Sequence, residues 1–242
     1  MHGLITRIFF KFYFTSFFRP IVKFILVITA YILENKEQKI DNDKLQAGSK
    51  LNKTYIQEHI DFTKDRLKNY PHDFNLYNLL FFLRTNHLRY TKNNNFYDKK
   101  ILSLGPRNIL ELLIIYLSGF KWKNIFGLDI ISKHKKIKIG DFSKKFPFED
   151  CAFDYVICSH SISKSADQNI TSNEIKRVLK EGGYLAISDN DTKENEFYIC
   201  NGFEKQYQTI LEMYANSNWY NLEYQRKVNN NTFEAIVKIE KN

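Results

Sequence analysis

The sequence predicts an α/β fold: a doubly wound, mostly parallel sheet with an antiparallel hairpin at its C-terminal edge and a helical extension at the N-terminus. From residue 99 onward, short apolar runs alternate with helix-like segments, which is the order that parallel sheets require. The chain closes with two long strand-like runs joined by Asn229-Asn230-Asn231, a pattern typical of an antiparallel pair. Before residue 99, apolar residues recur mainly at helical spacing instead.

Residues 1–33 form the first expected region, a basic amphipathic helical segment. They hold four basic residues and no acid, which is +4 of the chain's net charge of +9. Polar residues recur every four positions and cover one face of a helix, while the phenylalanines mostly fall elsewhere. The basic residues are Arg7, Lys11, Arg19 and Lys23.

The cleanest apolar run of this segment, residues 24–33, is about half as long as a membrane span, and no small-x-small cleavage site follows it. We therefore expect the segment to lie on an anionic membrane surface, with its phenylalanines toward the acyl chains. Packing of this face on the rest of the protein, or a true span, are the alternatives. The expected location is the cytoplasm, with peripheral attachment to the inner face of the membrane.

Residues 34–98 form the second expected region, a polar linker over 34–50 followed by a helical pair that caps the rest. Apolar residues at helical spacing predict two helices between residues 51 and 96, separated at Pro71. Residues 99–242 form the third region, the α/β domain. Its expected strands are 101–104, 124–128, 136–139, 153–158, 183–188, 219–228 and 232–240, and its expected helices are 108–118, 170–180 and 202–216.

Composition excludes several classes of protein. The chain has 242 residues, 43% of them hydrophobic and 16% aromatic, which is enough for a large core and argues against disorder. Its three cysteines, Cys151, Cys158 and Cys200, form no CxxC pair. They argue against a disulfide scaffold and a zinc site and favour a reducing cytosol, so we expect no metal.

The candidate binding residues are those that follow the expected strands, because ligands of open α/β sheets bind at the carboxyl ends of strands. Gly105 makes a tight turn before a helix N-terminus, and Asp129, which follows the next strand, is an acid that can hold ribose hydroxyls. Asp141 and Phe142 offer an acid and an aromatic ring for an adenine. Taken singly, Asp129 or Asp141 is also typical of a plain surface turn. After the fourth strand come Ser159, His160 and Ser161.

Five motifs carry a resemblance to a known family. They are Gly127-Leu128-Asp129, residues 139–142, Phe146-Pro147-Phe148-Glu149-Asp150, residues 153–157, and residues 174–185, where a helix is expected to end in Leu-Lys-x-Gly-Gly before a strand. With these motifs, residues 99–188 resemble a class I S-adenosylmethionine-dependent methyltransferase of the small-molecule type. The resemblance implies a Rossmann-like fold, S-adenosylmethionine as cofactor and methyl transfer as the reaction.

The resemblance also implies roles for the candidate residues. Asp129 would hold the ribose, Asp141 and Phe142 the adenine, and Gly105 the methionine part, with Ser159 facing what lies beyond the cofactor. His160 is the candidate base for an acceptor that must lose a proton, because its pKa lies near the useful range. A plain loop or buried histidine is the alternative for that position.

The first loop departs from the family pattern. The family usually has an acid before a Gly-x-Gly turn, but here the residues are Ser103-Leu104-Gly105-Pro106-Arg107, so only Gly105 matches. This loop is similar to that of some bacterial methyltransferase-like proteins of glycan and surface-polymer loci. Glu111 is the candidate replacement for the missing acid; otherwise the methionine end is bound differently or the site is inactive. The connection between Asp129 and Asp141 is short, so we expect no helix between them.

Other chemistries lack their motifs. The Gly-x-Gly-x-x-Gly of nicotinamide dehydrogenases is absent. Ser159-His160-Ser161 contains no proline, which argues against methylation of the exocyclic amines of nucleic-acid bases. Cys158 lies inside an apolar strand, which argues against carbon-5 methylation of cytosine. Residues 99–242 contain no basic cluster interleaved with aromatics, so nucleic acid is not an expected partner. We therefore expect methyl transfer to a small molecule or a glycan or surface-polymer intermediate. The alternative is a non-catalytic, membrane-tethered binding module with the same fold.

Overall fold

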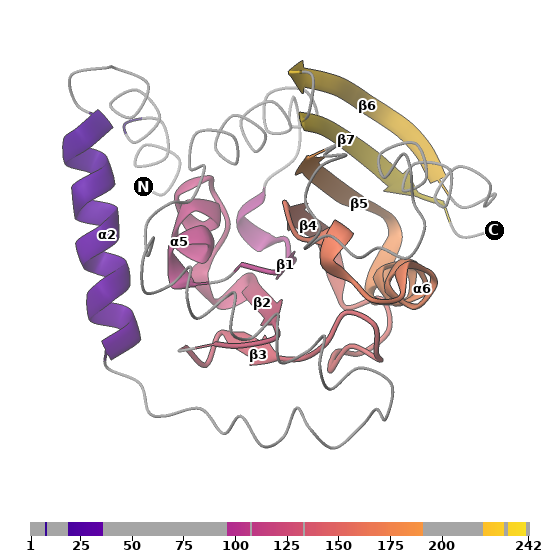
Figure 1. Cartoon of the computed structure of the whole chain (residues 1–242), viewed down its shortest axis with the longest axis horizontal. Helices are drawn as coiled ribbons and strands as arrows, with labels where there is room; N and C mark the ends of the chain where they lie inside the picture. The colour runs from indigo at the N-terminus through magenta and orange to yellow at the C-terminus, as the bar shows by residue number, and fades with distance from the viewer. Residues whose placement is uncertain are drawn as a thin grey trace. The chain divides into compact units, whose positions relative to one another are not determined.

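The computed structural model describes residues 8, 19–35, 96–106, 108–132, 134–190, 220–229 and 232–240 (Figure 1). Apart from a few end residues, the predicted linker, the predicted helical pair and the predicted helix at 202–216 lie outside these ranges. The chain divides into two compact units. One unit comprises Met1–Asp98 and Pro106–Ile139, and the other comprises Lys99–Gly105 and Gly140–Asn242.

Two helices pack together in the first unit. α2 (Arg19–Asn35) lies against α5 (Ile109–Leu117), and Leu26 and Ala30 are its buried residues among those whose side chains are described (Figure 1). α5 is buried from Ile109 to Ile115. The helix begins one residue later than predicted, because the side chain of Asn108 caps it by accepting a hydrogen bond from the N–H of Leu110 at 3.0 Å.

The first unit also holds two parallel strands, β2 (Ile125–Asp129) and β3 (Ile137–Ile139). The described residues between them, 130–132 and 134–136, contain no helix, as predicted. A short turn replaces it: the hydroxyl of Ser132 donates to the carbonyl of His134 at 2.8 Å and accepts from its N–H at 2.9 Å. β2 ends one residue later than predicted, so Asp129 is its last residue.

The described residues of the second unit contain five strands, in the order β1-β4-β5-β7-β6 (Figure 1). The first three run parallel to one another, whereas β7 is antiparallel to both β5 and β6. The predicted hairpin at the C-terminal edge is therefore confirmed. Helix α6 (Gln168–Val178) packs on β5. The strands are β1 (Ile101–Leu104), β4 (Phe153–Ser159), β5 (Leu179–Asn190), β6 (Tyr220–Asn229) and β7 (Thr232–Ile239).

The prediction of a helix to residue 180 is wrong. α6 ends at Val178, and β5 begins at once because Leu179 is extended and pairs with Phe153. Gly182 and Gly183 therefore do not stop a helix. Gly182 has a φ of +67° inside the strand, and a Cβ on Gly183 would lie 2.8 Å from the carbonyl oxygen of Lys180. The two glycines allow the register shift that β4 and β5 make at this point.

Candidate functional site

The end of β1 and the turn after β4 are in close contact within the second unit. The hydroxyl of Ser161 donates to the carbonyl of Leu104 at 2.6 Å. Gly105 follows with a φ of +72°, and a Cβ there would lie 2.5 Å from the Cβ of Ser161. Glycine is thus required twice, by the left-handed backbone and by the lack of space. The sequence singled out Gly105 and placed Ser161 in the turn after the fourth strand, but it did not predict the contact of Ser161 with Leu104, which lies 57 residues away in the chain.

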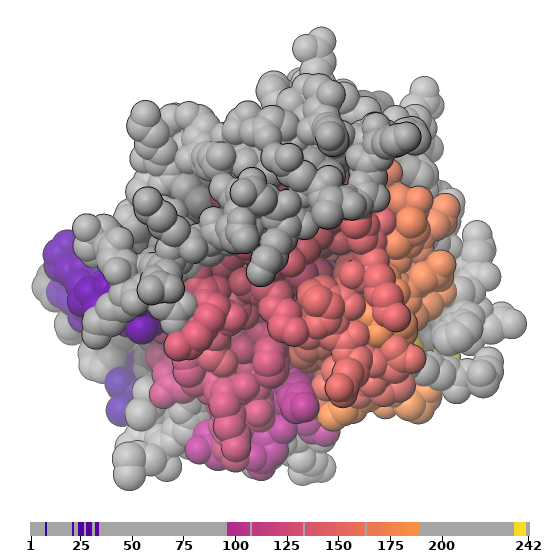
Figure 2. Space-filling view, turned by 90° about the horizontal axis from the view of Figure 1, so that it is seen from below, coloured from indigo at the N-terminus to yellow at the C-terminus, as the bar shows by residue number. Residues whose placement is uncertain are grey.

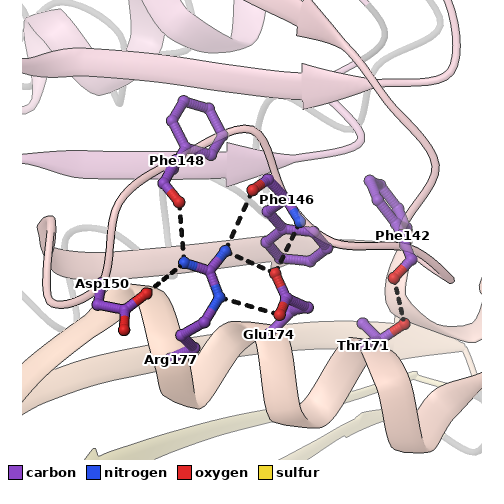
Figure 3. Close-up of polar contacts among 7 residues, drawn as sticks. All are labelled: Phe142, Phe146, Phe148, Asp150, Thr171, Glu174 and Arg177. Carbon is purple, nitrogen blue, oxygen red and sulfur yellow. Dashed lines mark hydrogen bonds and ion pairs between the residues drawn. The ribbon is translucent and has the colours of Figure 1, made fainter.

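Asp141 and Phe142 form the next turn of the second unit. The Asp141 carboxylate accepts a hydrogen bond from the N–H of Ser143 at 2.8 Å and closes the turn. The ring of Phe142 comes within 3.4 Å of where a Cβ on Gly105 would lie, and its carbonyl accepts from the hydroxyl of Thr171 at 3.0 Å (Figure 3). The structure therefore brings the predicted residues Gly105 and Phe142 together.

Three buried or half-buried hydroxyls hold this turn to the start of α6. Ser165 and Thr171 share a hydrogen bond of 2.6 Å between their hydroxyls, and the hydroxyls of Ser143 and Ser165 are 3.3 Å apart. The Ser143 hydroxyl also accepts from the N–H groups of Ala166 and Asp167 at 3.0 and 3.2 Å. We call Ser143, Ser165 and Thr171 the hydroxyl network. Sequence reasoning missed it, because isolated serines and threonines in loops carry no pattern.

β4 ends at Ser159, one residue later than predicted, and His160 follows it. Ser159 is buried and lies in register with Ser188 of β5. His160 is half-buried and has a φ of +54°, which is uncommon for a residue with a side chain. Its N–H donates to the carbonyl of Ser188 at 2.6 Å, and its Nε2 is 3.5 Å from the Ser188 hydroxyl. Such a backbone often marks a functional position.

The remaining two predicted residues lie in the first unit. Asp129 is 6% exposed, and its carboxylate accepts a long hydrogen bond, 3.4 Å, from the N–H of Ile131. Glu111 is 1% exposed in the first turn of α5, where the helix dipole favours a negative charge. Both are therefore buried acids, and Asp129 is not the plain surface-turn residue that the sequence alone allowed.

A second set of contacts anchors the loop between β3 and β4 on α6 (Figure 3). Arg177 donates to both carboxylate oxygens of Glu174, at 2.9 and 2.6 Å. It also donates to the carbonyls of Phe146 and Phe148 at 3.1 and 2.9 Å and to Asp150 at 2.6 Å. The N–H of Phe146 donates back to Glu174 at 2.7 Å. We call these five residues the Arg177 clamp.

The clamp shifts the pKa of both charged partners. Burial raises the pKa of Glu174, but hydrogen bonds from Arg177 and from the N–H of Phe146 outweigh it, so the pKa is below its usual range. The hydrogen bond to Glu174 in turn raises the pKa of Arg177. Two motifs of the sequence, 146–150 and Glu174 with Arg177, are thus the two sides of one contact.

Comparison with known proteins places this architecture. Residues 127–233 match the family model described as a methyltransferase domain. No protein of curated function matches the chain. Among solved structures, the PH0226 protein from Pyrococcus horikoshii OT3 is 20% identical with a TM-score of 0.53, and the match covers 73% of this chain and 99% of that one.

Two further structures are similar. A chain of the complex between the Haloferax volcanii Trm112 methyltransferase activator and a methyltransferase is 14% identical with a TM-score of 0.52, covering 79% of this chain and all of that one. An S-adenosylmethionine-dependent methyltransferase from Aquifex aeolicus is 16% identical with a TM-score of 0.49, covering 83% and 100%. With the strand order, the Pyrococcus structure confirms the predicted α/β, Rossmann-like fold.

Proposed function

We propose, because residues 127–233 of this chain match the model of the methyltransferase domain family, that the chain transfers a methyl group to a small molecule or to an intermediate of glycan or surface-polymer synthesis. The same match supports an enzyme, and it supports S-adenosylmethionine as the cofactor. The acceptor and the role of each residue are the finer parts of this proposal.

The observation that carries the residue assignment is the packing at the end of β1. Gly105 has a left-handed backbone there, and the ring of Phe142 lies against it. Asp141 precedes Phe142, and its carboxylate accepts a hydrogen bond from the N–H of Ser143 within the same turn. A carboxylate accepts hydrogen bonds from hydroxyls and amines, and an aromatic ring stacks on a base. The residues present therefore fit S-adenosylmethionine.

Each predicted residue has a proposed part in holding the cofactor. The Asp129 carboxylate would accept from the ribose hydroxyls, and Asp141 with Phe142 would hold the adenine. Gly105 would let the backbone approach the methionine part, with Glu111 supplying the acid that the first loop lacks. Ser159 would face the acceptor side.

Bound S-adenosylmethionine supplies a methyl group that its positive sulfur has already activated. The chain's own part is then to align the acceptor, so the catalytic gain comes mainly from proximity and orientation. His160 would take a proton from the acceptor at a ring nitrogen where the acceptor must lose one. The backbone N–H of His160 donates to the Ser188 carbonyl, and the ring Nε2 is 3.5 Å from the Ser188 hydroxyl. These two contacts would position the ring.

The acceptor class is supported by what surrounds β4. Cys158 is 0% exposed inside the strand, so its thiol is not placed to attack a cytosine. The turn at 159–161 is made of two serines and a histidine, without the proline that base-amine methylation commonly uses. These features favour a small acceptor over a nucleic acid, and the first loop's similarity to proteins of glycan loci favours a glycan intermediate.

Isothermal titration with S-adenosylhomocysteine tests cofactor binding. We expect the intact protein to bind, and we expect Asp129→Ala to weaken binding by about 30-fold or more, because a carboxylate holding two hydroxyls contributes about 2 kcal/mol. Glu149→Ala is the matched control, since Glu149 is an exposed acid in the loop that the clamp holds. Absence of binding by the intact protein at millimolar ligand would contradict the proposal.

Release of S-adenosylhomocysteine from S-adenosylmethionine tests the acceptor. We expect turnover with sugar-containing intermediates and none with transfer RNA or duplex DNA. His160→Ala should lower kcat about 100-fold while leaving cofactor affinity unchanged, which is the usual scale of general-base catalysis. Turnover with nucleic acid would overturn the acceptor class. Cofactor binding without turnover on any acceptor would favour the non-catalytic module instead.

A further inference from the structure

Helix α2 carries a continuous apolar stripe on its exposed side. Five large apolar residues recur along it at helical spacing and are 41–64% exposed. Among the described side chains of α2, the buried ones are Leu26 and Ala30, and they fall on the opposite side, where α2 packs on α5 within the same unit. We call Ile21, Phe24, Ile25, Ile28 and Ile32 the exposed stripe.

The exposed stripe is unusual for a surface that faces water. Single exposed apolar residues are common, but an unbroken row of isoleucine and phenylalanine marks an interaction surface. Indigo atoms, which belong to the N-terminal residues that include α2, are visible at the surface in Figure 2. The packing on α5 already covers the other side of the helix, so the stripe is the side left for an external partner.

Charge identifies the partner. Residues 1–33 contain Arg7, Lys11, Arg19 and Lys23 and not one acid, so the stripe stands in a locally positive segment. An apolar stripe on a helix of a basic segment matches an anionic lipid surface, which offers acyl chains to the stripe and negative headgroups to the basic residues. A nucleic acid would match the charge but would leave the isoleucines unsatisfied.

The length of the helix decides between crossing the bilayer and lying on it. α2 has 17 residues, which is about 25 Å of helix against a hydrocarbon core of about 30 Å. Across the described ranges, the structure contains no helix with the length and apolar character of a membrane span. We propose that the exposed stripe of α2 docks this enzyme on the surface of an anionic bilayer.

Flotation of the full-length protein with lipid vesicles tests this docking. The vesicles are phosphatidylcholine alone, or phosphatidylcholine with a quarter of phosphatidylglycerol. We expect about tenfold more bound protein with the anionic vesicles, since basic residues near such a surface are attracted to its negative headgroups. Phe24→Glu and Ile28→Glu should each lower binding by about tenfold or more, because each withdraws a large apolar group from the acyl region.

A matched control separates the exposed stripe from a general effect of charge. Ile170 on α6 is 40% exposed, so Ile170→Glu makes the same change at a similar exposure outside the stripe, and its binding should stay unchanged. The double variant Arg19→Gln with Lys23→Gln should lower binding to anionic vesicles only. Thermal melting verifies that every variant is folded.

Several outcomes would overturn the proposal. They are absence of binding, equal binding to neutral and anionic vesicles, or an equal loss in Ile170→Glu. A fourth is an oligomer that Ile28→Glu converts to a monomer without lipid, which would assign the exposed stripe to a second copy of the chain. None of these measurements uses methyl transfer, so the docking and the enzymatic proposal fail independently.

Discussion

The Arg177 clamp and the hydroxyl network both attach a loop to α6, but by different kinds of hydrogen bond. The clamp uses a guanidinium and carboxylates, with contacts of 2.6 to 3.1 Å. The hydroxyl network uses neutral groups, with contacts of 2.6 to 3.3 Å. Charge-assisted bonds are roughly twice as strong as neutral ones.

The loops that they hold also differ. The clamp holds residues 146–150, which include none of the predicted binding residues, while the hydroxyl network holds the turn of Asp141 and Phe142. The strongest contacts thus stabilise the fold next to the candidate site, and weaker ones hold the site itself. Substitutions should therefore separate stability from cofactor affinity.

Arg177→Ala should give the largest loss of stability. It leaves the Glu174 carboxylate, whose side chain is 13% exposed, without its cation, and it leaves two carbonyls without a donor. We expect the free energy of unfolding, measured with urea, to fall by about 3 kcal/mol. This loss lies toward the lower end of the range for a broken buried ion pair, because the site is not fully buried. Affinity for S-adenosylhomocysteine should change less than threefold. Arg177→Lys should be intermediate, and an equal loss of affinity in both variants would erase the contrast.

Gly105→Ala should affect both properties. The added methyl group meets Ser161, and the φ of +72° disfavours any side chain, so we expect a loss of about 2 kcal/mol. Gly182→Ala is the matched control, since its φ is +67° with no atom within 4 Å of the new Cβ. It should cost about 1 kcal/mol and spare cofactor binding. Equal effects of the two variants would show that the Ser161 contact is unimportant.

The clamp should also make stability depend on pH. The pKa of Glu174 is lower when folded than its ordinary value of 4.5, so folding is favoured when the group is ionised. That stability is fully present above the ordinary pKa and is lost as the pH falls through it and through the lower folded pKa. Glu174→Gln should flatten this decline in urea unfolding between pH 6 and pH 3.

Part of the loss of stability at low pH should remain in Glu174→Gln, because Asp154 also contributes to it. Burial raises its pKa, but the hydrogen bonds from the N–H of Lys100 and from Lys180 outweigh this, so its pKa also lies below the ordinary 3.8. Its contribution has the same sign and appears at lower pH. If the free energy of unfolding of Glu174→Gln depends on pH as that of the original protein does, the Arg177 clamp does not cause the loss of stability at low pH.

Thr171→Val should have the smallest effect on stability, about 1 kcal/mol, because it removes a buried neutral hydroxyl and keeps the shape. The carbonyl of Phe142 loses its donor, so we expect cofactor affinity to fall a few-fold by titration. Thr171→Ser keeps the hydroxyl and should restore most of that affinity. If Thr171→Val lowers stability but not affinity, the hydroxyl network does not position Phe142.

Much of the fold could be predicted because its signals are local. Asn108 sits where a cap is needed before an apolar helix, and the strands β1 and β4 are short runs of mostly buried residues. The edge hairpin is indicated by the asparagines between its strands. The helix end at 180 was wrong because the pairing of Leu179 with Phe153 decides it, and that partner lies on another strand.

The candidate site divides in the same way. Gly105, Asp141 and Phe142 could be found because they follow strands or match motifs. The contacts of Ser161 and Thr171 could not be predicted, because their hydrogen bonds join residues that are 57 and 29 positions apart in the chain. The clamp was visible as two motifs, but their contact is a property of the folded loop.

Charge, the succession of strands and the apolar character of residues 19–35 are properties of the sequence by itself, since each follows from local composition and spacing. Which apolar side of α2 is buried is not. Leu26 and Ala30 are covered, while Ile28 between them is 41% exposed, although all three are apolar. Hydrophobicity belongs to a residue, but burial needs a partner surface, and only the packing of α2 on α5 decides which face remains for another partner.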